Sequence, residues 1–181
     1  MTPLITGWLG DAPPPLSAVD AAESPLICAG CGLSGSLATD YRRQLGDGAL
    51  LCPVCALGPL APWEPARVRL AVIPELPQGR LNALMIRLTV HRLQVRAGAV
   101  PRSVDARLQA QILDGFQRRA ALTRHALPWA ASPALLRHTL RALPTAQRAV
   151  LMAELDGLRY LPEPTDPTLA RFFNHRRRLA V

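Results

Sequence analysis

All four cysteines of the chain stand in two Cys-x2-Cys pairs, Cys28/Cys31 and Cys52/Cys55, with twenty residues between the pairs. Two residues between cysteines form a tight turn that aims both sulfurs at one point, and two such turns complete a tetrahedron around a metal about 2.3 Å from each sulfur. The pattern therefore predicts one Zn²⁺ held by four thiolates. Because such a set leaves no coordination position open, the predicted zinc is structural.

Two disulfides, or a redox-active Cys-x-x-Cys, are the alternatives to a metal. Disulfides need an oxidising compartment, and residues 1–10 lack the basic start of an export signal, so a cytoplasmic location is expected. A redox site needs one pair at a strand-to-helix junction, whereas this chain has two pairs with Gly30 and Gly32 beside the first. Zinc is the favoured interpretation.

Catalytic residues are not grouped in the sequence. An HNH-type nuclease needs a histidine and a second metal ligand on the hairpin between the cysteine pairs, but residues 32–51 contain neither histidine nor asparagine. The chain has no lysine, which excludes a Walker P-loop and a lysine Schiff base. The histidines are scattered, and each is expected at a helix surface or end: His91, His125, His138 and His175. We therefore expect no enzymatic activity.

The positive charge is concentrated in the second half of the chain. Residues 1–90 carry six arginines against seven acidic residues, whereas residues 91–181 carry fifteen against six, and the whole chain has a net charge of +8. A zinc module beside a basic region is also typical of DNA-binding proteins, so the alternative function is that of a zinc-containing DNA-binding or regulatory protein, with nucleic acid as its partner. Against it, only Arg42 and Arg43 are basic between the cysteine pairs, and Arg176–Arg178 could be a solvated tail.

The elements that position the cysteines are short. Residues 1–25 contain three consecutive prolines and predict an extended arm, with Trp8 as its anchor. The segments 41–45 and 49–52 flank Gly46-Asp47-Gly48 and predict a β-hairpin that delivers the second cysteine pair, as in a zinc ribbon or a treble clef. Residues 67–72 alternate in polarity and predict a strand whose buried face carries Val68, Leu70 and Val72.

The hydrophobic period becomes helical from Gln78 onward. Four helices are expected to begin at Gln78, after Ser103, at Ser132-Pro133 and at Asp166-Pro167, and a further helix is expected to run from Thr145 to Leu158. The side chains expected to face the core are Leu81, Leu84, Met85, Leu88 and Leu93, then Val104, Leu108, Ile112, Phe116 and Ala120, then Val150, Leu151, Leu155 and Leu158, and last Leu169, Phe172 and Phe173.

The predicted fold class is α+β, mainly α. It comprises an extended arm (1–25), a four-cysteine zinc module with a proline-rich connection and a short strand (26–76), and a helical domain of four or five short helices with a basic tail (77–181). The module is expected to be HNH-like but catalytically degenerate. The longest charge-free runs, 24–39 and 48–63, have sixteen residues each and fall short of the roughly 20 that a membrane span needs.

Several segments together resemble one family. The chain resembles the DotN (IcmJ) proteins of type IVB, or Dot/Icm-type, secretion systems in four features. These are the two Cys-x2-Cys turns, which we call knuckles, a hairpin without HNH catalytic residues, the segment Ile73-Pro74-Glu75-Leu76-Pro77-Gln78 and the helix start Leu81-Asn82-Ala83-Leu84. The similarity continues loosely through Leu158-Arg159-Tyr160-Leu161-Pro162 to Phe172. The N-terminal arm, the proline-rich stretch 59–65 and the arginine-rich composition depart from the family, so a distant secretion or conjugation element is expected.

The resemblance implies an adaptor. DotN-like proteins are cytoplasmic members of the coupling complex at the inner-membrane face; they bind the C-terminal extension of the coupling ATPase DotL, alongside DotM and the chaperones IcmS and IcmW. Their zinc is structural, which matches Cys28, Cys31, Cys52 and Cys55 here. The residues that carry the segment after the knuckles are Pro74, Glu75, Leu76, Gln78, Leu81 and Asn82. The roles of His91 and of Arg176–Arg178 stay open.

Overall fold

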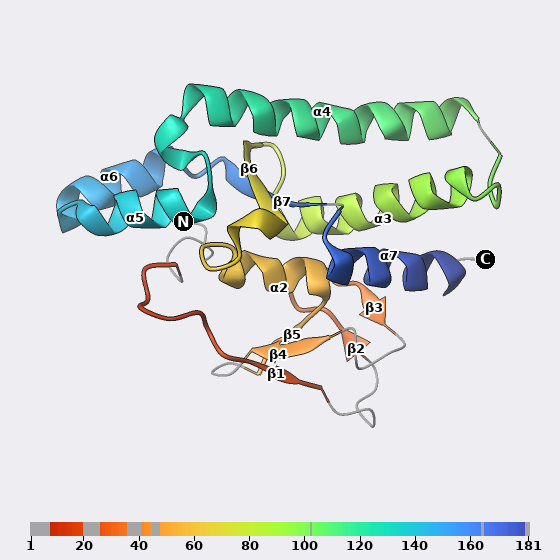
Figure 1. Cartoon of the computed structure of the whole chain (residues 1–181), viewed down its shortest axis with the longest axis horizontal. Coiled ribbons are helices and arrows are strands. Elements are labelled where there is room, and N and C mark those ends of the chain that lie inside the picture. Colours follow the sequence, from red (N-terminus) through yellow and green to blue (C-terminus); the bar gives the residue numbers. More distant parts are fainter. Residues whose placement is uncertain are drawn as a thin grey trace.

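The structure, a computed structural model, describes residues 8–19, 26–35, 41–44, 48–101, 103–163 and 165–179. Three small antiparallel sheets and six α-helices make up this described part of the chain. Figure 1 shows strands β1–β5 along the lower edge, helix α2 above them, α3 and α7 across the middle and α4 along the top. The predicted class, α+β and mainly α, is confirmed.

Two of the sheets surround the cysteine segments. The first has the order β1-β4-β5 and the second consists of β2 and β3. Their strands are β1 (Leu16–Ala18), β2 (Leu26–Ile27), β3 (Ser34–Gly35), β4 (Arg42–Gln44) and β5 (Leu50–Leu51). The antiparallel β4–β5 pair confirms the expected hairpin, while its turn residues 45–47 lie outside the described residues. The arm is more than an extended lead-in, because β1 pairs with β4.

Helix α2 (Pro53–Leu60) follows the hairpin and was not expected, because prolines bracket it. Pro53 stands in its first turn, where a missing N–H costs nothing, and Pro59 stands near its end. Pro59 has no N–H for the carbonyl of Cys55, four residues earlier. The Tyr160 hydroxyl lies 3.4 Å from that carbonyl oxygen and is placed to donate to it.

A third sheet joins distant parts of the chain. β6 (Val68–Val72) pairs antiparallel with β7 (Leu158–Pro162), with Leu70 opposite Tyr160. The expectation that Leu158 ends a helix was wrong: α6 stops at Glu154, and pairing with β6 overrides the helical period. The expected strand orientation was also partly wrong, since Ala71 is fully buried by the second core cluster while Val72, at the strand end, is 42% exposed.

Two of the five helices of the second half are long. They are α3 (Gln78–Arg96) and α4 (Val104–Ala126), which pack together and are followed by α5 (Pro133–Ala142), α6 (Thr145–Glu154) and α7 (Pro167–Leu179). The helix starts expected at Ser103, Ser132 and Asp166 are present, and each of these side chains caps its helix: Ser103 Oγ accepts from Ala106 N, Ser132 Oγ from Leu135 N, and Asp166 Oδ1 from Leu169 N. The expectation that all five would be short was wrong for α3 and α4.

The expected apolar ridge of α4 is buried only at its C-terminal end. Phe116 and Ala120 are buried, whereas Val104, Leu108 and Ile112 are 66%, 51% and 44% exposed. Each step of four residues turns about 40° beyond a full turn, so a ridge twelve residues long drifts about 120° around the helix. In α6, Val150 was also expected inward and is 62% exposed.

The buried side chains form two clusters. One joins the cysteine module to the helices, with Cys28, Val54 and Leu57 in the same cluster as Leu136 and Phe172. The other lies between the β6–β7 sheet, α3 and α4. The predicted division between residues 76 and 77 is crossed by the first cluster and stays a prediction. None of the described helices combines the length and the apolar character needed to cross a membrane.

Trp8 fastens the arm, as predicted. Its ring is 1% exposed, and its Nε1 donates to the carbonyl oxygen of Gly58 in α2 at 2.8 Å. From the other side, Arg137 of α5 donates its Nε–H to the Trp8 carbonyl oxygen at 2.8 Å and places its guanidinium over the Trp63 ring. The arm therefore links α2 with α5.

Candidate metal centre

The first cysteine pair lies in the turn between β2 and β3. Gly32 N donates to the Cys28 carbonyl oxygen at 2.8 Å, and the positive φ of Gly32, 71°, suits glycine. Gly30 needs to be small for a different reason, because a Cβ there would lie 2.9 Å from Cys55 Sγ. The turn therefore brings its backbone against the second cysteine pair.

The second cysteine pair starts helix α2. Cys52 is the residue before the first helical turn, and Cys55 lies within that turn. The backbone N–H of Cys52 points at Cys28 Sγ, with an N to S distance of 3.3 Å. A helix N-terminus carries partial positive charge, so this placement favours thiolates over thiols.

The four sulfur atoms lie within 4.8 Å of one another, in the one group of metal-ligating side chains found among the described residues. All four cysteines are free, and Cys31 Sγ and Cys52 Sγ are 3.8 Å apart. A tetrahedron with metal–sulfur distances of about 2.3 Å has edges of about 3.8 Å. The residues therefore fit a single tetrahedrally coordinated metal ion.

Because most of the cysteines are buried, four thiolates in this cluster would be unfavourable without a cation to balance their negative charge. Cys28, Cys52 and Cys55 are 1%, 0% and 5% exposed. Hydrogen bonds from Cys31, Cys52 and Cys55 lower the pKa of Cys28. For Cys52 and Cys55, the hydrogen bond to Cys28 has the opposite effect and, together with burial, raises their pKa values. One thiolate is thus stabilised at the expense of its neighbours, and a divalent cation would remove that conflict.

A buried polar network surrounds Cys55. Asn82 of α3 donates from Nδ2 to Cys55 Sγ at 3.2 Å and to Tyr160 Oη at 2.7 Å. Gln78, one turn earlier, donates to Asn82 Oδ1 at 2.8 Å and exchanges hydrogen bonds with the backbone of Tyr160. Burial raises the pKa of Tyr160 well above its usual value, so the hydroxyl stays protonated. The network ties α3 and β7 to the metal ligands.

The start of α3 also touches the first knuckle directly. A Cβ on Gly79 would lie 2.1 Å from the carbonyl oxygen of Gly30, so only glycine fits at this position. Gln78, Gly79 and Asn82 thus form one face of α3 that closes over the cysteine site. Sequence reasoning identified Gln78 and Asn82 as motif residues without assigning them contacts.

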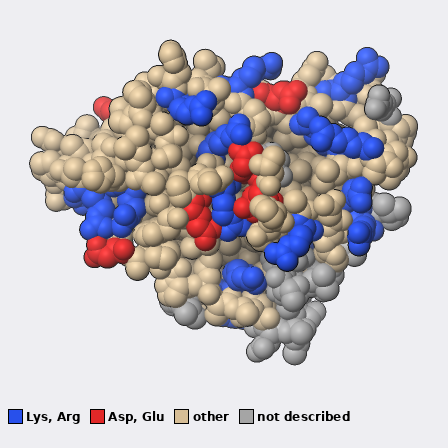
Figure 2. Space-filling model, viewed as in Figure 1, with Lys and Arg blue, Asp and Glu red and all other residues tan. Residues whose placement is uncertain are grey.

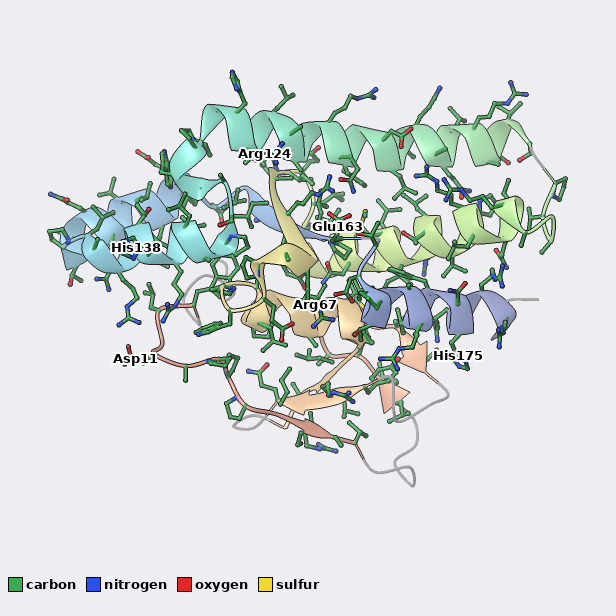
Figure 3. All side chains as sticks on the ribbon, viewed as in Figure 1. Asp11, Arg67, Arg124, His138, Glu163 and His175 are labelled. Atoms are coloured by element: carbon green, nitrogen blue, oxygen red, sulfur yellow. The ribbon has the colours of Figure 1, made fainter. Side chains whose placement is uncertain are left out.

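The other residues considered from the sequence are not gathered around one site. His91 and His175 are partly buried on α3 and α7, and His125 and His138 are exposed; Figure 3 labels His138 and His175, which lie on different helices. Arg176–Arg178 belong to the last turns of α7, where Arg176 donates to the Ser34 carbonyl oxygen at 2.6 Å. This contact places Arg176 against β3.

Comparison of the sequence with protein-family models and with curated proteins finds no match.

Proposed function

We propose that this protein is a non-enzymatic adaptor whose fold is stabilised by one structural Zn²⁺ at Cys28, Cys31, Cys52 and Cys55. The four-sulfur geometry supports this metal, since closed tetrathiolate sites are typical of structural zinc. When bound, the ion cross-links the two knuckles and neutralises the charge of the buried thiolates. The placement of the four histidines on four different helices supports a non-catalytic role.

The order of elements favours a treble clef over a zinc ribbon. A knuckle at Cys28 and Cys31 is followed by the β4–β5 hairpin and then by α2, whose N-terminus carries the second ligand pair, Cys52 before its first turn and Cys55 within it. A ribbon would take both pairs from hairpin turns. We propose an HNH-like module without the nuclease residues, because the hairpin segment carries no histidine.

The observation that carries the adaptor proposal is the position of the segment that resembles DotN proteins. Its residue Asn82 donates to Cys55, Gln78 donates to Asn82, and Gly79 between them lies against Gly30, so the knuckles and the segment form one structural unit. Such a coupled pair of motifs is expected if both belong to one family. We therefore propose a subunit of a type IVB, or related conjugative, coupling complex at the inner-membrane face.

The proposed partner is the C-terminal extension of a DotL-like coupling ATPase, with DotM-like and IcmS/IcmW-like subunits as further members. The test is co-expression of the zinc-loaded protein with this extension from the same genome, followed by purification through a tag on the extension. A one-to-one complex in gel filtration at physiological salt is expected. Elution of the two as separate folded species would overturn the partner assignment.

Nucleic acid is the second candidate partner, and the arginines that line the hollow between α3 and α4, Arg69, Arg92 and Arg96, favour it. Binding dominated by phosphate contacts falls by roughly 10³–10⁵ in affinity between about 50 and 200 mM salt for six to ten contacts. Retention of submicromolar binding to duplex DNA at physiological salt would favour this candidate over the adaptor.

A further inference from the structure

Two hollows lie on the same side of α4, away from the cysteine cluster. The first, of about 370 Å³, is bounded by β6, the C-terminal half of α4 and the start of α5, and includes Arg124 and Ser132. The second, of about 320 Å³, lies between α3 and α4 and includes Arg92 and Arg96. Arg69 and Glu163 line both, so the hollows are adjacent parts of one groove, which we call the arginine groove.

The side chain of Arg69 crosses the middle of the arginine groove. Its Nε lies 2.6 Å from Glu163 Oε2, and its Nη1 donates to Gln117 Oε1 of α4 at 3.0 Å. Figure 3 shows Glu163 between α3 and α4, and Arg124 close to β6 where the groove continues. Glu163 is the acidic residue that lines the groove, and it is paired with Arg69.

The remaining charges of the groove are positive. Arg92, Arg96 and Arg124 line it in addition to Arg69, and Arg92 makes only a loose ion pair of 3.7 Å with Asp114. The described contacts give Arg96 and Arg124 no carboxylate partner. Figure 2 shows arginines spread over the part of this face formed by α3 and α4, with most of the visible carboxylates near its centre. The groove therefore favours an anionic ligand.

Polar and apolar atoms share the surface of the groove. Buried side chains of both clusters line it: Val68, Leu70, Met85, Leu113 and Ala120. The lining residues of α4 run from Leu113 to Arg124, which corresponds to about 16 Å along a helix and to about five residues of extended chain. Separate guanidinium groups along a groove of mixed polar and apolar surface match an extended segment that carries carboxylates at intervals along its length.

We propose that the arginine groove binds an extended acidic segment of a partner protein. The inference rests on the proposed adaptor function and specifies the surface and the chemistry of its partner. Single-stranded nucleic acid fits less well, because none of the residues that line the groove carries an aromatic ring on which a base could stack. Carboxylates of the bound segment pair with Arg92, Arg96 and Arg124.

The test uses the full-length zinc-loaded protein and a fluorescein-labelled ten-residue peptide of alternating Glu and Leu, followed by fluorescence anisotropy at physiological salt. Arg96→Glu and Arg124→Glu are expected to weaken binding at least tenfold each. Arg118→Glu is the matched control, because Arg118 is exposed on α4 and lines neither hollow. Thermal unfolding of each variant verifies that it is folded.

Loss of peptide binding in Arg96→Glu and Arg124→Glu, with binding kept in Arg118→Glu, supports the inference. Equal weakening by Arg118→Glu would overturn it, because net charge would then explain the binding, and so would failure of the wild type to bind the peptide. A single-stranded oligonucleotide that binds more tightly and loses affinity in the same variants would reassign the groove to nucleic acid. If the Arg96→Glu/Arg124→Glu double variant co-purifies with the ATPase extension as well as the wild type does, the groove is not the binding surface. The proposed adaptor function would be unaffected by that result.

Discussion

Asn82 donates a hydrogen bond from Nδ2 to Cys55 Sγ at 3.2 Å, although the two residues belong to different helices, α3 and α2. The same amide group donates to Tyr160 Oη at 2.7 Å. A buried side chain that satisfies both a sulfur and a hydroxyl leaves little freedom for either element to move. The metal ligands are therefore positioned by residues outside the cysteine segments.

Replacing Asn82 is expected to weaken metal binding. Asn82→Asp keeps the shape of the side chain but turns the donor into an acceptor with negative charge, which should lower zinc affinity by about 10- to 100-fold. Competition with a chromophoric chelator at neutral pH measures this change. Asn174→Asp is the matched control, because Asn174 is the other asparagine of the chain and is exposed on α7. Equal zinc affinity of the two variants would show that the Asn82 contact is dispensable.

Tyr160 and Asn82 are expected to act together in stability. Tyr160→Phe removes a hydroxyl that accepts from Asn82 and lies 3.2 Å from the Val54 carbonyl oxygen, at a cost of about 1–3 kcal/mol. A double-mutant cycle with Asn82→Ala should give a coupling of at least about 0.5 kcal/mol in urea unfolding. Tyr41 is the comparison, because its hydroxyl donates to Leu33 O instead. A cycle with Tyr41→Phe should be additive, and equal coupling in both cycles would contradict the network.

Two glycine-to-alanine changes should have opposite effects. A Cβ at Gly79 would meet the Gly30 carbonyl oxygen at 2.1 Å, whereas a Cβ at Gly115, inside α4, meets nothing within 4 Å. Gly79→Ala must push α3 away from the first knuckle and should lower the melting temperature. Gly115→Ala should raise stability by about 0.5–1 kcal/mol, because alanine is the better helix former. A Gly79→Ala protein that melts like wild type would disprove the close approach.

The parts of this fold that were predictable from sequence depend on local interactions. The cysteine spacing, the hairpin around Gly48 and the helix caps at Ser103, Ser132 and Asp166 each involve residues a few positions apart. Strand β7 was missed because its partner β6 lies about ninety residues earlier, and the apolar pattern before it continues that of α6. Long-range pairing decided the conformation.

The contacts around the metal site were missed for a related reason. Tyr160 contacts Asn82 and Cys55 from strand β7, whose pairing with β6 was not predicted. One local signal was present: Gln78 and Asn82, one helical turn apart, place two amides on a helix face that also carries Leu81 and Met85. Amides at buried positions need partners, so such a pair indicates a polar network.

Asp166 should stabilise the start of α7 in two separable ways. Its carboxylate makes two hydrogen bonds with Arg67, at 2.7 and 3.3 Å, and also caps the N–H of Leu169. Although burial opposes ionisation, the hydrogen bonds from Arg67 and from Leu169 lower the pKa of Asp166, so the carboxylate is ionised at neutral pH. Asp166→Asn should keep the cap and lose the ion pair, whereas Asp166→Ala should lose both.

Urea unfolding of the zinc-loaded protein measures these losses. We expect about 1 kcal/mol for Asp166→Asn and about 2 kcal/mol for Asp166→Ala, since a cap and a partly buried ion pair each contribute about 1 kcal/mol. Asp114→Asn is the control, because Asp114 is exposed and lies 3.7 Å from Arg92. Indistinguishable Asn and Ala variants would mean that capping by residue 166 contributes nothing.

Removal of zinc should unfold more than the cysteine module. Structural tetrathiolate sites contribute apparent binding energies of about 10–16 kcal/mol, which is as large as the entire stability of a typical domain. Because Gly79 and Asn82 contact the knuckles and Gln78 donates to Asn82, loss of the metal should loosen the first turn of α3 as well as residues 26–35 and 48–60. We expect one zinc per chain by elemental analysis, and insoluble or partly unfolded protein for Cys52→Ser.

Hydrogen exchange with and without a zinc chelator resolves where structure is lost. Exchange should accelerate in the cysteine module and over residues 78–82, and less in the middle of α4, which packs on β6 and α3 rather than on the knuckles. Adding zinc back should restore protection in the wild type and not in Cys52→Ser. If the chelator leaves exchange over residues 78–82 unchanged while releasing the metal, α3 is held by its own core contacts with α4 and α7. The Asn82–Cys55 contact would then be a consequence of the fold, with no part in stabilising it.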